Sequence, residues 1–277
     1  MKNNTLIIFV IVLLTMCVVI LSGLLFLGIS NNSNRFIFNF KNRNKVLDDL
    51  VFDEEYEKEF NKIVINAEAA NIEIRRSNKN QLVVYGEKDL LEVRDEKDLY
   101  VNYDAKPCKF FCLNINLGKI ILYLEEDFEG LIEIKNDYGD IEIEEFLQSE
   151  IKIESSYGDT KVDGVKTLTA DSSAGTIEIG TVTDAKINNN YGDIKIDLVD
   201  NKADINADCG NIKIKKMYIK ENSNINNNFG DIKIESTSDV LIEADVSLGD
   251  KKINNNNYKS DIILKIENNC GDIKVNQ

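Results

Sequence analysis

A short glycine-centred pattern recurs nine times between residues 118 and 271 of this 277-residue chain. The clearest copies are residues 190–196 and 228–234, which read Asn-Tyr-Gly-Asp-Ile-Lys-Ile and Asn-Phe-Gly-Asp-Ile-Lys-Ile. Successive glycines are 17 to 22 residues apart. A near-constant period of this size predicts a stack of similar units, each resting on the next. The repeat glycines are Gly118, Gly139, Gly158, Gly175, Gly192, Gly210, Gly230, Gly249 and Gly271.

Each unit contains two segments in which Ile or Val alternates with charged residues, one before the glycine and one after it. Ile194 and Ile196 after Gly192 are examples. This alternation predicts half-buried strands. The period is too short for a four-stranded propeller blade, which needs about 40–50 residues. Because equivalent positions hold equivalent residues, we predict in-register parallel pairing between units. The expected fold is all-β, a right-handed parallel β-solenoid of about ten short coils.

The positions around the glycine predict separate roles. The glycine itself is expected to take a positive φ at a corner, which other residues resist. The residues two and three places before it are mostly Asn, Ser or Asp, which hydrogen-bond nearby backbone at corners and stack in ladders. The residue just before the glycine is mostly large and apolar, and we predict that this column points into the core. Its members are Leu117, Tyr138, Tyr157, Ala174, Tyr191, Cys209, Phe229, Leu248 and Cys270.

The remainder of the chain divides into two further segments. Leu6 to Ile29 are 24 nearly unbroken apolar residues, enough to cross a bilayer as a helix and longer than the apolar part of a cleavable signal. We predict an uncleaved transmembrane anchor in residues 1–30 and a juxtamembrane linker in residues 31–61. Within the linker, residues 46–60 fit either a weak amphipathic helix that caps the first coil or an irregular acidic segment.

The solenoid is then expected to occupy residues 62–277. Residues 62–75 match a diverged first coil, in which Ala70 takes the position of the glycine. Residues 76–117 hold further strands without a visible period, and indicate an irregular opening section.

Composition excludes several classes of function. The chain carries 48 acidic and 33 basic side chains, a net charge of −15, which disfavours nucleic acid as a partner. Histidine is absent, so Ser-His-Asp and Cys-His nucleophiles and imidazole metal sites are excluded. Glu125, Glu126 and Asp127 could supply an acid/base pair for glycoside cleavage only if a cleft fixed their separation. A turn explains them more simply, and we predict a protein without enzymatic activity or cofactor.

Two columns of charge follow the glycine. Asp occupies the next position in six of the nine copies. These residues could bind Ca²⁺, but the spacing favours carboxylates that bond the corner backbone, and no metal site is predicted. Three places after the glycine, five successive copies carry lysine, which predicts a basic stripe about 20 Å long. It is either a face for an acidic partner or, as we favour, edge protection and solubility. The five are Lys195, Lys213, Lys233, Lys252 and Lys274.

The cysteines and the last repeat lead to two further predictions. Cys209 and Cys270 are expected to be small core residues three coils apart, at least about 14 Å, which is too far for a disulfide. Whether Cys108 and Cys112 pair across a tight loop stays open. The last copy, residues 269–277, would leave an unpaired outer edge at the C-terminal end, where another chain could add a strand.

Several repeats together resemble a known bacterial family. Residues 155–159, 169–179 and 189–194, with the opening segment 70–74, are similar to the putative adhesins with β-strand repeats, which are related to the toastrack domains of envelope-stress proteins. The resemblance covers residues 62–277. It implies a bacterial, membrane-anchored protein that is not an enzyme, and it supplies no catalytic residues.

The resemblance also decides the expected topology. Basic residues follow the apolar segment closely, so the positive-inside rule alone would keep the solenoid in the cytoplasm. The resemblance implies the reverse, and we predict a single-pass cell-membrane protein with the solenoid outside the cytoplasm. The expected function is a binding or sensing module at the envelope, with a protein or an envelope polymer as partner and self-association through the C-terminal edge. The alternatives are a structural or adhesive surface protein and, more remotely, a carbohydrate-active enzyme.

Overall fold

The computed structural model describes residues 45–105 and 116–277. Within these ranges the chain forms nineteen strands and one 3-10 turn, η1 (Lys88–Leu90), and contains no helix long and apolar enough to span a membrane. The proposed anchor and the Cys108–Cys112 pair lie outside the described residues. The opening strands are β1 (Lys45–Val46), β2 (Leu50–Tyr56), β3 (Lys62–Ser77), β4 (Asn80–Tyr85), β5 (Leu91–Arg94), β6 (Leu99–Tyr103) and β7 (Asn116–Glu125).

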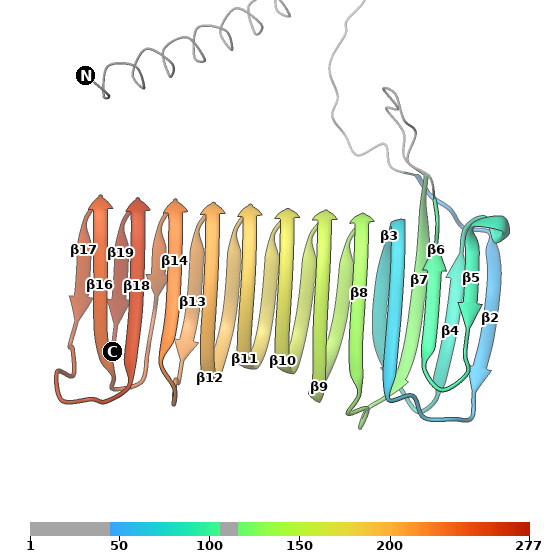
Figure 1. Cartoon of the computed structure of the whole chain (residues 1–277), viewed down its shortest axis with the longest axis horizontal. Helices are drawn as coiled ribbons and strands as arrows, with labels where there is room; N and C mark the ends of the chain where they lie inside the picture. Colours follow the sequence, from blue (N-terminus) through green and yellow to red (C-terminus); the bar gives the residue numbers. More distant parts are fainter. Residues whose placement is uncertain (1–44, 106–115) are drawn as a thin grey trace, which may run out of the picture. The chain divides into compact units, whose positions relative to one another are not determined.

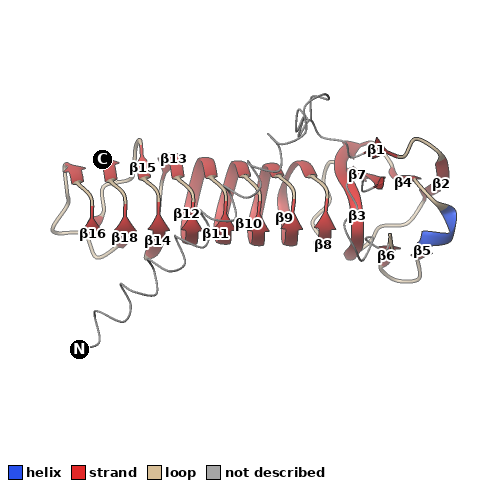
Figure 2. Cartoon of the chain, turned by 90° about the horizontal axis from the view of Figure 1, so that it is seen from above, coloured by secondary structure: helices blue, strands red, loops and turns tan. Residues whose placement is uncertain are grey.

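The repeat region is built from parallel coils that lie side by side (Figures 1 and 2). Its strands are β8 (Leu131–Tyr138), β9 (Ile141–Tyr157), β10 (Thr160–Ala174), β11 (Ile177–Tyr191), β12 (Ile194–Cys209), β13 (Ile212–Met217), β14 (Ser223–Phe229), β15 (Ile232–Ile234), β16 (Leu241–Leu248), β17 (Lys251–Asn254), β18 (Ile263–Cys270) and β19 (Ile273–Asn276). This confirms the all-β prediction; the right hand of the solenoid stays a prediction.

Pairing between coils is parallel and in register, as the repeat predicts. Ile177 of β11 pairs with Ile194 of β12, which pairs with Ile212 of β13. These side chains are buried in continuous rows between the two faces of the coil. Stacking like on like therefore buries one isoleucine against the next, and the rows form the core of the array.

From Gly139 onward, glycine is required at the first corner of each coil for two reasons. Gly192 has a φ of 133°, a region that side chains disfavour. A Cβ added there would also lie 2.1 Å from the carbonyl oxygen of Gly175 in the preceding coil. The predicted positive φ is confirmed for eight of the nine repeat glycines. It is wrong for Gly118, which pairs with Ala70 and whose missing side chain instead makes room for the Tyr103 ring.

The variable repeat length is absorbed at the opposite corner. Between β11 and β12, Val182 pairs with Val199, whereas Asp184 pairs with Lys202, so the register shifts by one residue there. The glycine corner keeps the same register from coil to coil. Extra residues are thus tolerated where the backbone is not in close contact with its neighbour.

The N-terminal end of the stack is closed by antiparallel strands. The diverged first coil, β3, lies inside: it pairs with β8 and β9 on one side and with β6 and β7 on the other. Beyond it, β5 pairs antiparallel with β6, while β4 pairs with β7 and β2 with β4. Both alternatives considered for residues 46–60, the capping helix and the irregular acidic segment, are therefore wrong, because residues 50–56 form a strand that obtains its backbone partners from β4. Tyr56 at its end is buried edge-to-face on Phe60 at 5.2 Å.

The C-terminal coil does not end the stack, contrary to the sequence-based prediction. β18 pairs with β14 on one side and with β16 on the other, and β19 lies likewise between β15 and β17. Figure 1 shows β16 and β17 as the outermost strands. The chain first forms the outermost coil, β16 and β17, and then returns to form β18 and β19 between that coil and β14 and β15. Gln277 is held inside, where its backbone N–H donates to the Asn254 carbonyl at 3.2 Å.

The open edge therefore belongs to residues 241–254 and is partly shielded by the chain that leaves it. The Asn256 carboxamide accepts from the N–H of Ile242 at 2.8 Å and donates to its carbonyl at 2.9 Å. The Asn256 side chain thus makes the two hydrogen bonds to Ile242 that the backbone of a further strand would make at this edge. Ala244 and Val246, which would be fully covered inside the stack, remain half-buried.

This coil order predicts an unusual effect of truncation. Removing residues 263–277 should expose the backbone amides of β16 and β17, because their only described partners are β18 and β19. Hydrogen exchange of the truncated protein measures this directly. If residues 241–254 stayed fully protected after truncation, β16 and β17 would be pairing with β14 and β15, which is the order expected from the sequence, and the prediction would be wrong.

Candidate functional site

The five predicted lysines form one uninterrupted row, called here the lysine ladder. Register pairs Lys195 with Lys213, Lys213 with Lys233, Lys233 with Lys274 and Lys274 with Lys252. The predicted contiguity is confirmed, but the order is not that of the chain, since the inserted C-terminal coil places Lys274 before Lys252. All are exposed except Lys233, which is half-buried.

Carboxylates neutralise the part of the ladder nearer the centre of the array. Lys195 bonds Glu178 at 2.8 Å, and this hydrogen bond raises the pKa of the lysine. Glu235 accepts from Lys233 at 2.8 Å and lies 3.2 Å from Lys213. Hydrogen bonds from these two lysines lower the pKa of Glu235.

The distal end of the ladder differs. Lys252 and Lys274 have no ion pair among the described residues, and the next outward-facing residues along their strands are Asn254 and Asn276. The outer two steps of the ladder are consequently the part most able to meet an external anion.

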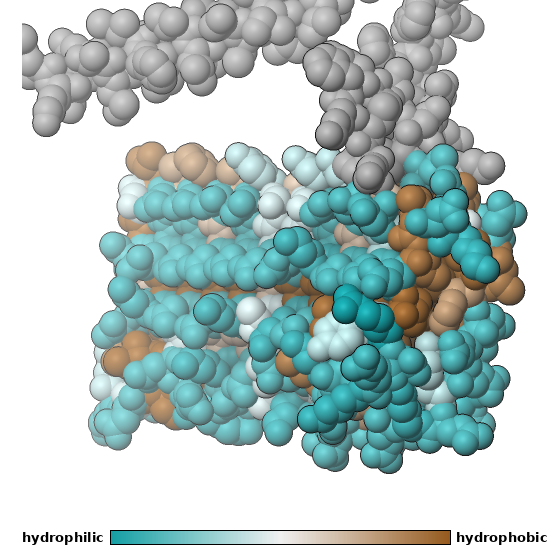
Figure 3. All heavy atoms as spheres, turned by 45° about the vertical axis from the view of Figure 1, so that its right-hand side comes forward, coloured by the Kyte–Doolittle hydropathy of each residue, from teal (hydrophilic) through white to brown (hydrophobic). Residues whose placement is uncertain are grey.

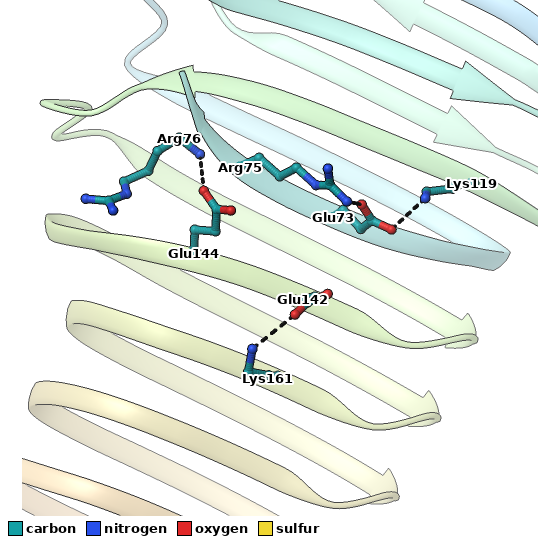
Figure 4. A network of polar contacts seen from close by, with 7 residues as sticks. All are labelled: Glu73, Arg75, Arg76, Lys119, Glu142, Glu144 and Lys161. Atoms are coloured by element: carbon teal, nitrogen blue, oxygen red, sulfur yellow. Dashed lines mark hydrogen bonds and ion pairs between the residues drawn. The ribbon is translucent and has the colours of Figure 1, made fainter. Parts of the chain in front are cut away.

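Toward the other end of the array the same row runs through Glu178, Lys161, Glu142 and Glu73, so its sign alternates and then repeats. Lys161 bonds Glu142 at 3.1 Å across adjacent coils (Figure 4). One coil further, Glu73 pairs with both Arg75 and Lys119. Such exposed pairs contribute little stability individually. They cancel the charge of these lysines within the row. In the distal coils the row itself holds no carboxylate, and the nearest outward-facing ones are Asp250 and Asp272, two places before the lysines.

A groove of about 340 Å³ lies beside the ladder where a glycine interrupts the neighbouring row. Gly180 lacks a side chain between Asp163 and Asp197, and Lys215 bonds Asp197 at 2.7 Å along its wall. Sequence reasoning missed this hollow, because Gly180 falls outside the repeat pattern and only the register brings it between two aspartates.

The aspartates after the glycines accept hydrogen bonds from backbone N–H groups, as expected. The N–H groups belong to the neighbouring coil and not to the aspartate's own corner. Asp159 N–H donates to Asp140 Oδ1 at 2.9 Å, and Thr176 N–H donates to Asp159 Oδ1 at 2.7 Å. The same contact joins Asn211 to Asp193 and Asp272 to Asp231. Each carboxylate thus satisfies an N–H that the corner leaves outside the strand ladder. No group of three or more potential metal ligands occurs within residues 45–105 and 116–277.

The column before the glycines faces outward, so its predicted inward direction is wrong for the regular coils. Tyr191 is 63% exposed, and Tyr157, Phe229 and Leu248 are also exposed. Tyr138, Ala174, Cys209 and Cys270 are half-buried, while Leu117 of the irregular section is buried. The sequence predicts the inward direction because the column is mostly large and apolar. In β11, which runs to Tyr191, Asn189 is buried but Asn190 and Tyr191 are both exposed, so the inside–outside alternation is interrupted just before the tyrosine.

The corner interior is filled by the polar residue three places before the glycine. Asn189 is 1% exposed, and its Nδ2 donates to the carbonyls of Gly175 and Gly192, both at 3.1 Å. Asn136, Asn227 and Asn268 bond glycine-corner carbonyls in the same way. Predicted bonding of corner backbone is thus confirmed for these asparagines. The hydroxyls of Ser155 and Ser172 at the same position have no hydrogen-bond partner within the described part of the chain, and Ala207 and Val246 occupy it in two further coils. An apolar side chain would fit the space but leave the carbonyls unpaired.

Two substitutions separate the inside of the corner from the outside. Asn189→Ala should destabilise the fold by about 1–3 kcal/mol, because it leaves two buried carbonyls without a donor. Tyr191→Ala, two residues away, should cost under about 0.5 kcal/mol, as expected at an exposed position. Urea unfolding measures both free energies. If Tyr191→Ala lowered the free energy of unfolding more than Asn189→Ala, the column before the glycines would point into the core after all.

The carboxylates considered for acid/base chemistry lie at the irregular end of the array. Glu125 and Asp127 line a hollow of about 760 Å³ together with Glu59, Glu129 and Glu150, whereas Glu126 points to solvent. The hollow is strongly acidic and open. Its position at the turn after β7 agrees with the simpler explanation that these residues form a turn.

Cys209 and Cys270 are closer than predicted. Both pair with Phe229 on opposite sides, so they are two coils apart, about 9.6 Å, and not three. Both are free thiols, as the distance requires. They lie half-buried in the outward column and are not core residues.

Comparison with known proteins agrees with this architecture. The chain belongs to the Toastrack DUF4097 family, whose model matches residues 60–277. No curated protein matches it. A crystal structure of a putative adhesin from Bacteroides fragilis is 18% identical, with a TM-score of 0.44, over 82% of this chain and 97% of that one.

Two further crystal structures are similar over most of their length. A putative cell adhesion protein from Clostridium sporogenes is 16% identical, with a TM-score of 0.27, over 82% of this chain and 99% of that one. A putative lipid binding protein from Parabacteroides distasonis is 12% identical, with a TM-score of 0.34, over 83% and 99%. At these levels of similarity no residue role is transferred to this chain.

Proposed function

We propose that this protein is an extracytoplasmic binding module of the cell envelope, held by its N-terminal apolar segment, and that its lysine ladder binds a linear anionic polymer. The observation that carries the proposal is the register of the ladder: five consecutive coils each contribute one lysine to a single straight row. The row is about 19 Å long. A polymer with regularly spaced phosphates is the ligand that such a row fits.

The distal lysines are the principal contacts in this proposal. Lys252 and Lys274 need not break an internal ion pair to bind, whereas Lys213 and Lys233 must leave Glu235. The aspartates beside the ladder are short and accept backbone N–H groups, while the lysine side chains extend further from the sheet. The net charge of −15 opposes diffuse binding of polyanions, so specific contact with the ladder is needed.

A sensing role in the envelope-stress response is the finer form of this proposal. It rests on membership of the toastrack family. No catalytic step and no cofactor form part of it.

Removing the distal charges should weaken binding. In titrations with long-chain inorganic polyphosphate, Lys252→Gln/Lys274→Gln should lower the affinity several-fold. It should also flatten the slope of log affinity against log salt by about 1.4, the loss of two phosphate contacts. Glu235→Gln should raise the affinity, because it releases Lys213 and Lys233.

The matched control is Lys166→Gln/Lys186→Gln, which removes the same charge from exposed positions outside the ladder. It should leave the salt slope unchanged. An equal loss in the control would mean that only the overall charge is sensed and that the ladder is not a binding site.

The extracytoplasmic location has its own test. Tyr258 is 81% exposed in the segment that follows β17, so Tyr258→Cys provides an accessible thiol. In a background with the five native cysteines replaced by serine, a membrane-impermeant maleimide should label it on intact cells. Labelling only after lysis would place the array in the cytoplasm.

A further inference from the structure

The true order of the coils gives the outward column a regular profile. Register places its members next to one another, ending with Phe229, Cys270 and Leu248. From Tyr157 onward, large and small side chains therefore alternate, whereas Tyr138, the residue before Tyr157 in the column, is also large. In chain order Leu248 would follow Phe229 directly, so the alternation depends on insertion of the last coil. The column reads Tyr157, Ala174, Tyr191, Cys209, Phe229, Cys270 and Leu248.

The large members of this row, called here the ridge, are exposed. Tyr157 is 54% exposed, Phe229 58% and Leu248 69%. Figure 3 shows brown and pale spheres along this upper edge, above continuous hydrophilic rows. Six coil spacings make the ridge roughly 29 Å long. A continuous apolar strip on an otherwise charged surface is typical of an interaction site.

The alternation makes the ridge complementary to itself. Consider a second copy facing it, related by a two-fold axis that passes between the coils of Tyr191 and Cys209, perpendicular to the solenoid. Tyr191 of each copy then meets Cys209 of the other. By the same symmetry Phe229 meets Ala174, and Tyr157 meets Cys270. Each of these three pairs joins a large side chain to a small one, and each occurs twice. At each end of the ridge Leu248 meets Tyr138, the residue next to Tyr157, so two large side chains face each other there.

From this geometry we infer that the ridge is a homodimerisation surface, in which the large side chains of one copy fill the gaps over the small residues of the other. The occupant is thus a second copy of this chain. The inference does not depend on the lysine ladder, which lies on a separate row of each coil.

One of the two rows beside the ridge offers complementary polar contacts to a second copy. Under the same two-fold axis, Asn190 meets Asp208 and Ser173 meets Asn228, which are donor and acceptor pairs. On the other side, Asp159 meets Asp272. That row carries aspartate in most coils, so its charge opposes the close approach of a second copy as well as of an anion to the ridge itself. The acidic contacts also mean that the dimer should become stronger as salt is added.

The available area predicts a weak dimer. An aromatic side chain buries about 150–250 Å² in full, so side chains that are half to two-thirds exposed offer roughly 400 Å² per copy along the ridge. A standard stable interface needs about 800 Å² per partner. The dimer should therefore form reversibly, at high protein concentration.

The test measures self-association of the full chain in mild detergent by sedimentation equilibrium, from about 1 µM to about 1 mM. Tyr191→Ser should weaken the dimer about tenfold, because two contacts of the ridge are lost. Ala174→Tyr is the decisive variant. It makes the ridge more apolar but fills the gap that Phe229 of the partner needs, so it should also weaken the dimer about tenfold.

Both variants are expected to fold. The neighbouring rings of Tyr138 and Tyr157 already stack at 5.2 Å in adjacent coils, so a tyrosine at position 174 is accommodated, and unchanged melting temperatures would verify this. Tyr218→Ser, an exposed tyrosine outside the ridge, should leave association unaltered.

Stronger association of Ala174→Tyr would show non-specific adhesion of apolar surface and overturn the proposal. So would a wild-type protein that stays monomeric throughout. The inference would likewise be overturned if the ridge variants changed binding to an insoluble polysaccharide or to neutral phosphatidylcholine vesicles while the protein remained a monomer.

Discussion

The whole array depends on the contact between the glycine corner of one coil and that of the next. At each step the glycine Cα lies against the preceding glycine carbonyl, so closely that a Cβ would come within about 2 Å of it, as at Gly192 on Gly175. The positive φ turns the chain from one face to the other. Because this corner cannot change length, it fixes the register of every strand beside it. All the surface rows follow from that register.

Hydrogen bonding at the corner comes from side chains as well as backbone. The buried asparagine three places before the glycine donates to the corner carbonyls, and the aspartate after it accepts an N–H from the adjacent coil. At these corners, where the strand ladder is interrupted, side chains thereby supply hydrogen-bond partners to backbone carbonyls and to backbone N–H groups. The glycine itself recurs in every regular coil, whereas the asparagine is replaced by Ser, Ala or Val in some coils and the other corner varies in length.

A register that is fixed at the core turns repeated residues into continuous surface features. One lysine per coil becomes a ladder, and alternating large and small residues become a ridge. Binding along the ladder and self-association along the ridge use different rows of the same coils, so the two proposals are physically compatible. A dimer joined at the ridge would present two ladders, and a polymer spanning both would bind with a higher effective affinity.

The sequence alone determined the coil. Period, alternation and like-on-like positions predict parallel in-register strands, because side-chain direction along a strand has a period of two and the stack needs equivalent residues to meet. Three features were decided only by the tertiary structure. The corner turns Tyr191 outward and leaves Asn189 inside. Edge pairing makes a strand of residues 50–56. The last coil returns into the array beside β14, because the backbone of β14 accepts any in-register coil, and local sequence does not specify which of two similar coils fills that place.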